Sequence, residues 1–322
     1  MNNSNGTHKI NATSNQMNEM LEYYKGYLTY NSSPYIIARA KPANATITFY
    51  QTNVVLFQGI NETAEYNYWA KKYNLEQDFY NNQFNKNYSE LSAIGSDEVG
   101  TGDYFGPIVV CATYVDNSKI SELYELGVKD SKLLTDKQMI PLALKLAQII
   151  PYSVVFLDPL KLNSLTKKKD NLNFIKAYLH NKVINSILKK IPTVKYDAIL
   201  IDEFTPKEKY FEYLKNETNV VTDVTMLKHG EKHHLAIAAA SIIARVTFLR
   251  ELSKMSKEYD FEFYKGAGPE VDRNAISFTK SAGWDELKKV AKMKFANTER
   301  IRNYFINNPL PKSKQGSFYE DK

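Results

Sequence analysis

The segment 94–110, IGSDEVGTGDYFGPIVV, contains the residue types of a hydrolytic site. Two adjacent carboxylates, Asp97 and Glu98, end an apolar lead-in, and Gly100 and Gly102 follow them. Acidic side chains at a strand end, beside backbone without side chains, can hold a hard cation close to a phosphodiester. The segment therefore favours a metal-dependent nuclease.

A dinucleotide-binding turn is the alternative explanation for the glycines at 100, 102 and 106. That turn requires a helix to open at the glycines, so that its N-terminus meets the pyrophosphate. Residues 108–115 are instead rich in β-branched side chains and predict a second strand. Asp97 and Glu98 would also repel a pyrophosphate. An acidic hairpin turn without catalytic function is the remaining alternative for the motif taken alone.

Asp202 ends a second apolar run, residues 198–201. Carboxylates at the ends of neighbouring core strands can converge without burial among apolar side chains. Strand alternation places Asp202 and Glu203 on opposite faces, and the pattern does not say which face carries the site. Asp97 and Glu98 pose the same difficulty, because both can serve one site only where the strand breaks. The glycines at 100 and 102 allow such a break.

Glu231 lies in the segment 228–234, KHGEKHH, before an alanine-rich stretch. Taken singly, a carboxylate at this place is explained by helix capping and the helix dipole. The three histidines of the segment suggest zinc, but the chain has one cysteine and no HExxH spacing. Surface or supporting histidines are the preferred interpretation.

Oxygen-only ligands of high charge select Mg²⁺ or Mn²⁺ over zinc. Clustered carboxylates repel one another unless a cation neutralises them. Two such ions, roughly 3.5–4 Å apart, can activate water and stabilise the leaving oxygen of an in-line displacement. This chemistry needs no nucleophilic side chain, and the sequence contains no recognisable Ser/His/Asp or Cys/His arrangement.

Composition indicates a soluble, cytoplasmic protein, expected to be a monomer. The 322 residues are 43% hydrophobic, and the single cysteine, Cys111, excludes a disulfide framework and is expected in the core. The first five residues are polar, which predicts no secretory signal. The longest apolar stretch, residues 235–249, is interrupted by Ser241 and Arg245, which argues against a membrane span. The net charge of +6 is compatible with a polyanionic partner.

Two regimes of residue pattern predict two domains. After an Asn/Ser/Thr-rich start, expected to be frayed to about residue 15, the pattern predicts a helix over 17–28, three short strands over 35–40, 45–50 and 54–58, and a helix over 61–73. A polar linker without periodicity follows. From residue 91 the pattern predicts a strand hairpin and then alternating elements: helix 135–149, strand 152–157, helix 171–190, strands 198–201 and 220–224, helix 233–252 and a helical tail. This order suggests an α/β layer structure with a mixed sheet.

Three motifs resemble a known family. Residues 95–107, GSDEVGTGDYFGP, closely resemble the signature of bacterial ribonuclease HIII, residues 129–132 look like the Asp-Ser-Lys block of type 2 ribonucleases H, and residues 238–245 resemble their helix motif. The resemblance runs from about Tyr35 to the C-terminal helices. It implies an RNase H-like mixed sheet flanked by helices, preceded by a small α+β domain that resembles the TATA-binding-protein fold. The corresponding boundaries are a substrate-binding domain at 1–85, a linker at 86–90 and a catalytic domain at 91–322.

The resemblance implies endonucleolytic cleavage of the RNA strand of RNA–DNA hybrids, with Mg²⁺ or Mn²⁺ as cofactor, two ions during catalysis, and 5′-phosphate and 3′-hydroxyl ends. The four acids of the family fall on Asp97, Glu98, Asp202 and Glu231, which favours Asp202 over Glu203. Glutamate ten residues before Ser241 favours the HIII branch over HII, which usually has aspartate there. Residues 265–268, KGAG, replace a Tyr-Gly block that HII relatives use at RNA–DNA junctions. That difference implies weak action on a single embedded ribonucleotide.

Substrate contacts are predicted in three places. The backbone of Gly100, Thr101 and Gly102 can approach a ribose closely enough to read its 2′-hydroxyl. Other candidates are polar side chains that could contact phosphate or the hybrid surface: Lys129, Ser131 and Lys132 in the catalytic domain, and Arg39, Lys41, Tyr50 and Gln51 in the N-terminal domain. Two alternative functions stay open, namely HII-like incision at single ribonucleotides in duplex DNA and a catalytically silent hybrid-binding protein.

Overall fold

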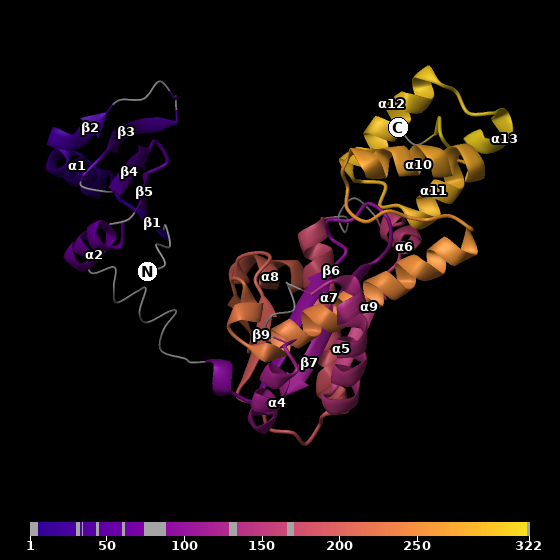
Figure 1. Ribbon diagram of the computed structural model, residues 1–322, viewed down its shortest axis with the longest axis horizontal. Helices are drawn as coiled ribbons and strands as arrows, with labels where there is room; N and C mark the ends of the chain where they lie inside the picture. The colour runs from indigo at the N-terminus through magenta and orange to yellow at the C-terminus, as the bar shows by residue number, and fades with distance from the viewer. Residues whose placement is uncertain are drawn as a thin grey trace. The chain divides into compact units, whose positions relative to one another are not determined.

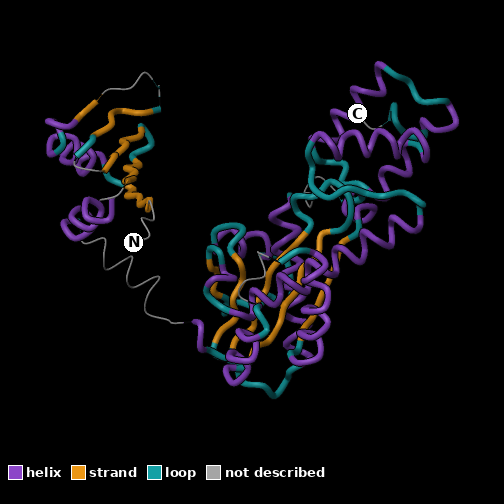
Figure 2. Tube along the Cα trace, viewed as in Figure 1, coloured by secondary structure: helices purple, strands orange, loops and turns teal. Residues whose placement is uncertain are grey.

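The computed structural model describes residues 6–29, 33, 35–42, 45–59, 62–73, 88–128, 134–165 and 171–320. Contacts within the chain divide it into two compact units, residues 1–87 and 88–322. Figure 1 and Figure 2 show both units, and each is described by itself.

The described part of the first unit is a five-stranded antiparallel sheet with the helices α1 and α2. Its strands lie in the order β1-β5-β4-β3-β2. The elements are β1 (Gly6–Asn11), α1 (Ser14–Tyr23), η1 (Lys25–Tyr27), β2 (Leu28–Thr29), β3 (Ile36–Ala40), β4 (Ala45–Tyr50), β5 (Val54–Gly59) and α2 (Glu62–Lys72). A capping box between Thr13 and Gln16 starts α1, which satisfies backbone N–H groups at the helix N-terminus.

One face of this sheet carries the core of the unit. Alternate strand residues, among them Ile47, Phe49 and Phe57, pack with Met20 of α1 and Trp69 of α2. The intervening residues therefore point to the opposite sheet face, which the two helices do not cover.

The polar start of the chain was expected to be frayed, and for residues 6–11 this was wrong. These residues form β1, which pairs antiparallel with β5. The physical reason is that this edge strand pairs with the backbone of β5 and is anchored inward by Ile10, which is 2% exposed, and by His8, which stacks on Tyr66.

The second unit is built on a mixed five-stranded sheet with the order β10-β9-β6-β7-β8. The strands β6, β9 and β10 are parallel to one another, whereas β7 is antiparallel to both β6 and β8. Their bounds are β6 (Ala93–Val99), β7 (Ile108–Val115), β8 (Tyr152–Leu157), β9 (Ala198–Asp202) and β10 (Thr225–Leu227). The pairing of β6 with β7 confirms the predicted hairpin, and no helix opens at the glycines between them.

Helices cover both faces of this sheet (Figure 1). On one face α9 (Leu235–Glu258) lies against β6 and β7, and α5 (Asp136–Ile149) packs on α9. On the other face α7 (Leu172–Lys190) contacts β6, β7 and β8, with α8 (Lys207–Leu214) beside it. A Cβ at Gly95 would lie 2.3 Å from the backbone nitrogen of Ile237, so glycine lets α9 approach the strand closely. Short elements fill the connections: η2 (Tyr88–Glu90), η3 (Asn117–Lys119), α4 (Ile120–Glu125), α6 (Pro159–Asn163) and η5 (Gly230–Lys232).

The last part of the chain forms a helical group. It consists of α10 (Pro269–Ala282), α11 (Trp284–Val290), α12 (Ala296–Asn307) and α13 (Lys312–Gln315). Trp284, Phe278 and Phe305 are buried there and continue the core that lies beneath α9.

Most predicted elements are confirmed, but the strand predicted over 220–224 is wrong. The strand on this side is β10, and it begins at Thr225, where it pairs with Leu200 of β9. The backbone N–H of Val221 donates to the side chain of Asn181 at 3.0 Å and so has a side-chain partner in place of a strand partner. Cys111 is buried in β7 as expected. Among the described residues, no helix is long and apolar enough to cross a membrane.

Candidate active site

The acidic segment lies at the end of β6, where the chain turns into β7. The strand continues through Val99 without a break, so Asp97 and Glu98 point to opposite faces of the sheet. The turn starts at Gly100, whose φ is +93°. A Cβ at this position would lie 2.2 Å from the carbonyl oxygen of Pro107, which explains the glycine by conformation and by space.

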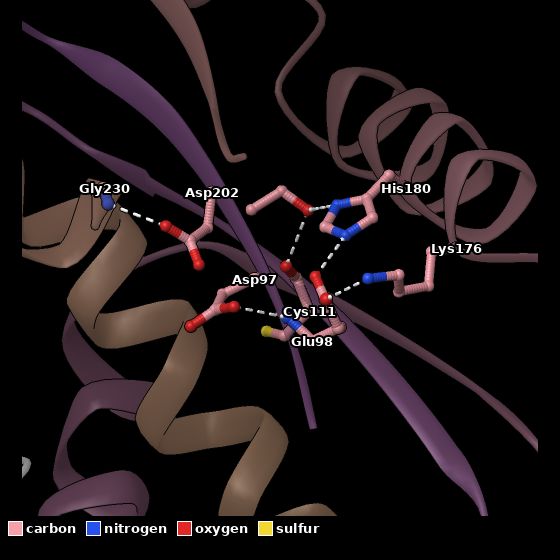
Figure 3. A network of polar contacts seen from close by, with 8 residues as sticks. Asp97, Glu98, Cys111, Lys176, His180, Asp202 and Gly230 are labelled. Carbon is pink, nitrogen blue, oxygen red and sulfur yellow. Dashed lines mark hydrogen bonds and ion pairs between the residues drawn. The ribbon is translucent and has the colours of Figure 1, made fainter. Parts of the chain in front are cut away.

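Asp97 and Asp202 come together on the α9 side of the sheet. Asp202 ends β9, and its Oδ1 accepts a hydrogen bond of 2.7 Å from the backbone N–H of Gly230 (Figure 3). Burial, followed by the negative charges of Glu98 and Asp202, raises the pKa of Asp97 to about 8. A hydrogen bond from the Glu98 N–H, 2.7 Å long, and one with Ser241 act in the other direction. The two aspartates thus form a close acidic pair in which burial and neighbouring charges oppose the ionisation of Asp97.

Glu98 is held on the α7 side by two basic residues. Its Oε1 lies 3.1 Å from Nζ of Lys176, and its Oε2 lies 2.9 Å from Nε2 of His180 (Figure 3). Burial acts to raise the pKa of Glu98, but the His180 hydrogen bond and the charges of His180 and Lys176 outweigh it and lower that pKa. Glu98 is therefore an ionised carboxylate with its own counter-charges.

The ring of His180 is held between Ser96 and Glu98. The hydroxyl of Ser96 donates to the carbonyl oxygen of Cys111 at 3.0 Å, so it accepts from Nδ1 of His180, 2.7 Å away. Nε2 faces the carboxylate of Glu98, which only accepts. Both ring nitrogens of His180 therefore have polar partners inside the site. Phe204 stacks on this ring with centroids 5.1 Å apart, and Lys176 Nζ lies 4.4 Å from the Phe204 centroid.

Sequence reasoning missed Lys176 and His180. They lie four residues apart on a helix that was predicted, so their common helix face could be read from the spacing. No sequence signal connected that face to Glu98, some 80 residues earlier in the chain.

Glu231 is buried in η5, next to the residue that contacts Asp202. The preceding His229 has a left-handed backbone, with φ at +55°. A Cβ at Gly230 would lie 2.5 Å from Cδ1 of Ile237, so the segment packs tightly against α9. Glu203, the alternative to Asp202, lies 3.8 Å from the exposed Lys228.

The zinc interpretation of the histidines has no support in the geometry. His234 caps α9: its Nδ1 accepts from the N–H of Ala236 at 2.9 Å, and its Nε2 donates to the carbonyl of Leu91 at 3.0 Å. Both ring nitrogens are therefore used. Within the described ranges, no three His, Cys, Asp or Glu side chains form a group that could already hold a metal ion.

The donor set nevertheless fits a hard divalent cation. Asp97 and Asp202 supply carboxylate oxygens only, and burial, followed by the charges of Glu98 and Asp202, raises the pKa of Asp97. Such a pair gains stability from a cation with oxygen preference. Glu98 already has basic partners on the other face, so the side chain of Glu98 would have to share or leave them to join a common ion.

The candidate ribose-reading turn is open at one position. Gly102 is exposed, and a Cβ placed there would meet nothing within 4 Å, in contrast to Gly100. Thr101 between them is half-buried. The predicted phosphate contacts Lys129, Ser131 and Lys132 lie outside the described residues.

An ion cluster joins the segments around the site. Asp136, the first residue of α5, accepts from Nε of Arg245 at 3.2 Å and also pairs with Lys265. Arg245 belongs to the recognised helix motif, and Lys265 begins the KGAG segment. These interactions lower the pKa of Asp136, although its burial acts to raise it.

In the first unit, the candidate residues spread over one sheet face and its ends. Arg39 lies opposite Thr48 of β4, on the face that α1 and α2 do not cover, and its Nε is buried with no hydrogen-bond partner in the described structure. Tyr50 ends β4 on that same face by alternation. Gln51 lies in the exposed turn after Tyr50, and Lys41 is exposed beyond the other end of the sheet.

One basic residue of that face was missed. Lys9 of β1 is exposed and pairs in register with Leu56, which in turn pairs with Thr48 beside Arg39. Because the start of the chain was expected to be frayed, the alternation His8-Lys9-Ile10, which indicates a strand with Lys9 on its outer face, was not used.

Comparisons with known proteins agree along the chain. The family model described as Ribonuclease HII matches residues 94–298, and the one described as a domain of unknown function (DUF3378) matches residues 8–80. Ribonuclease HIII of Enterococcus faecalis is 40% identical over 299 residues, which cover 92% of this chain and 98% of that protein. Ribonuclease HIII of Bacillus pumilus is 40% identical over 301 residues, with 92% and 98% covered. The crystal structure of Bst-RNase HIII in complex with Mn²⁺ has a TM-score of 0.66 and 33% identity, and the match covers 93% of this chain and 99% of that one.

Proposed function

Because the chain belongs to the ribonuclease HIII family, we propose that it cleaves the RNA strand of RNA–DNA hybrids internally, with the help of two divalent cations, and leaves 5′-phosphate and 3′-hydroxyl ends. The family and the fold identify it as a ribonuclease H. The observation that carries the proposal is the pair Asp97–Asp202 at the ends of two neighbouring strands. Burial, followed by the charges of Glu98 and Asp202, raises the pKa of Asp97, and a bound cation would offset this effect.

Four acidic residues would hold the cations: Asp97 and Asp202 on the α9 side, joined by Glu98 and by Glu231 of η5. A bound Mg²⁺ or Mn²⁺ would supply positive charge at the scissile phosphate and make a water molecule easier to deprotonate. The likeness to an RNase HIII structure that contains Mn²⁺ supports this donor set.

The surrounding residues prepare these carboxylates. The Glu98 N–H and Ser241 fix the side chain of Asp97, and the Gly230 N–H fixes that of Asp202. Lys176 and His180 keep Glu98 ionised inside a partly buried site. The chain's own contribution is thus orientation and charge state, both present before substrate arrives.

Selection of the RNA strand is assigned to the turn 100–102. The turn directly follows Asp97 and Glu98 in the chain, and the open space over Gly102 lets a ribose come close. The 2′-hydroxyl both donates and accepts hydrogen bonds, so backbone N–H and C=O groups can distinguish ribose from deoxyribose.

We assign binding of the RNA–DNA hybrid to the N-terminal domain, residues 1–85, and to Lys129, Ser131 and Lys132. The buried Nε of Arg39 has no hydrogen-bond partner among the described residues and lies on the sheet face that α1 and α2 leave uncovered, which supports a polar ligand there. Tyr50, Gln51 and Lys41 are further candidates on that sheet and at its ends.

A cleavage assay tests the proposal. The substrates are a long RNA–DNA hybrid, a DNA duplex with one embedded ribonucleotide and an all-DNA duplex, each incubated with Mg²⁺, with Mn²⁺ and with EDTA. We expect internal cleavage of the long hybrid with either metal and no cleavage in EDTA. Extension of the RNA products by a DNA polymerase reports 3′-hydroxyl ends.

Three outcomes would contradict the proposal in whole or in part. Efficient incision at the single ribonucleotide would assign an HII-like activity, and absence of any cleavage would assign hybrid binding without catalysis. A rate that rises with the first power of Mg²⁺ concentration far below saturation would argue against two ions.

A further inference from the structure

Lys292 is a buried lysine that the catalytic site does not account for. It is 1% exposed, and its Nζ donates to the carbonyl oxygen of Phe105 at 3.1 Å and to that of Gly106. The ring centroid of Phe295 lies 5.8 Å from the same nitrogen. In the part of the chain that the structure describes, none of its hydrogen bonds goes to a carboxylate.

The segment 103–106 is clamped from two sides. On one side the N–H of Lys292 donates to the carbonyl of Tyr104 at 2.8 Å, and the N–H of Gly106 donates to the carbonyl of Val290 at 3.1 Å. On the other side the N–H of Gly266 donates to Oδ1 of Asp103 at 2.6 Å, and the N–H of Tyr104 donates to the carbonyl of Gly266 at 2.8 Å. The C-terminal helical group thereby holds the segment that follows the Gly-Thr-Gly turn.

The position of the segment 103–106 affects the position of the turn 100–102, because both contact the same side chain of α9. Gly106 has φ at +80°, and a Cβ there would lie 3.1 Å from the ring of Phe248 of α9. Gly100 packs on the same ring and against the carbonyl of Pro107. A shift of the carbonyls at 105 and 106 would therefore move the backbone on which Gly100 rests.

The chemistry of the amine suits a backbone clamp. Burial lowers the pKa of Lys292 to about 7, so its charge is costly at this position. The protonated and the neutral amine both carry at least two N–H donors, so both forms can satisfy the two carbonyls. An apolar side chain would leave the carbonyl oxygens of Phe105 and Gly106 buried without these donors. Leaving a buried acceptor unpaired costs more free energy than a typical hydrogen bond contributes.

We propose that Lys292 is a positioning residue for ribose recognition: it fixes the turn 100–107 in the conformation that reads the 2′-hydroxyl, and so sets the preference for hybrid over DNA duplex. This inference rests on the ribose-reading role proposed above for the turn. Lys292 touches neither the acidic residues nor the scissile phosphate in this assignment.

The test compares Lys292→Met with Lys288→Met. Methionine keeps most of the side-chain volume and removes the donors. Lys288 lies in α11, four residues earlier, and its Nζ bonds to Ser317 instead of the turn, so its variant is a matched control for loss of a lysine. Each full-length protein cleaves a labelled hybrid in Mg²⁺ while an unlabelled DNA duplex of the same sequence competes, which yields KM for the hybrid, kcat, and Ki for the duplex.

For Lys292→Met we expect KM to rise about tenfold, the equivalent of one or two lost hydrogen bonds, with Ki for the DNA duplex unchanged and kcat changed by less than about twofold. Amide hydrogen exchange at residues 100–107 should be faster than in the wild type and in Lys288→Met. Lys292→Gln keeps an amide donor without a charge, so its KM for the hybrid should lie between those of the wild type and Lys292→Met. It replaces Lys292→Met in the test if the methionine variant does not fold.

An unchanged ratio of Ki to KM in a folded variant would overturn the inference, even with a lower melting temperature, because Lys292 would then be merely structural. Faster exchange spread evenly over the catalytic unit would overturn it as well. Failure of the wild type to cleave the hybrid is a separate result, and it would remove the proposed function instead.

Discussion

Removing the charge of Lys176 is expected to increase the stabilisation that a divalent cation gives this protein. Lys176 Nζ lies 3.1 Å from Oε1 of Glu98, and both side chains are only 11% exposed. In Lys176→Met, Glu98 retains its contact with His180. Negative charge at the end of β6 is then less compensated, so a bound cation recovers more free energy than in the wild type.

The magnitude follows from the geometry of the pair. Loss of one partner from a buried ion pair costs about 3–5 kcal/mol, and the remaining His180 contact reduces this to about 2 kcal/mol here. Methionine can keep the packing of the lysine stem, so little of the loss comes from a cavity. If saturating Mg²⁺ restores half of the loss, about 1 kcal/mol, the apparent Mg²⁺ affinity rises about fivefold.

The assay is urea denaturation followed by circular dichroism, in EDTA and in saturating Mg²⁺, together with the dependence of Tm on Mg²⁺ concentration. The matched control is Lys182→Met on the same helix, because Lys182 is exposed and lies over the ring of Tyr178, 6.0 Å from its centroid. The control should gain the same free energy from Mg²⁺ as the wild type.

Two results would refute this reasoning. An equal loss of stability in EDTA and in Mg²⁺ would show that Lys176 does not substitute for a cation. A smaller gain from Mg²⁺ in Lys176→Met than in the wild type would show that Lys176 helps to build the metal site, for example by orienting Glu98.

Three further predictions concern the acidic pair, the turn and the N-terminal unit. Asp97→Asn should abolish hybrid cleavage. In EDTA the wild type should lose stability as pH rises from about 4 to about 8, because the folded protein keeps the Asp97 proton up to a pKa of about 8 whereas the unfolded chain releases it near 3.8. Asp97→Asn should not show this loss. Urea titrations in which the free energy of unfolding of both proteins changes equally with pH would contradict this. Gly100→Ala should lower Tm markedly, since its Cβ would lie 2.2 Å from the Pro107 carbonyl oxygen. Gly102→Ala should keep the wild-type Tm and raise KM for the hybrid, because a Cβ there meets nothing within 4 Å. Equal Tm values of the two variants would contradict the different roles of the two glycines. Removal of residues 1–85 should raise KM for the hybrid more than it lowers kcat, and a collapsed kcat at constant KM would count against a role of this domain in hybrid binding.

Local residue patterns were enough for most elements of the fold. Thr135 and Asn171 cap α5 and α7 where the sequence predicted those helices to start, because capping depends on residues within one turn. The β-branched run after Pro107 formed β7 as expected. The errors at residues 6–11 and 220–224 arose where strand pairing was decided by a partner distant in the sequence, namely β5 and β9.

The sequence by itself determined which acids end the central strands and that glycines bend the chain beside them, since these depend on neighbours in the chain. Only the tertiary structure decided that Asp97 meets Asp202 on one face while Glu98 turns to Lys176 and His180 on the other. It also decided that Lys292, from the C-terminal region, holds the turn. The physical reason is that a side chain's charge state and position depend on burial and on partners that packing brings from elsewhere in the chain, and no local pattern encodes those distances.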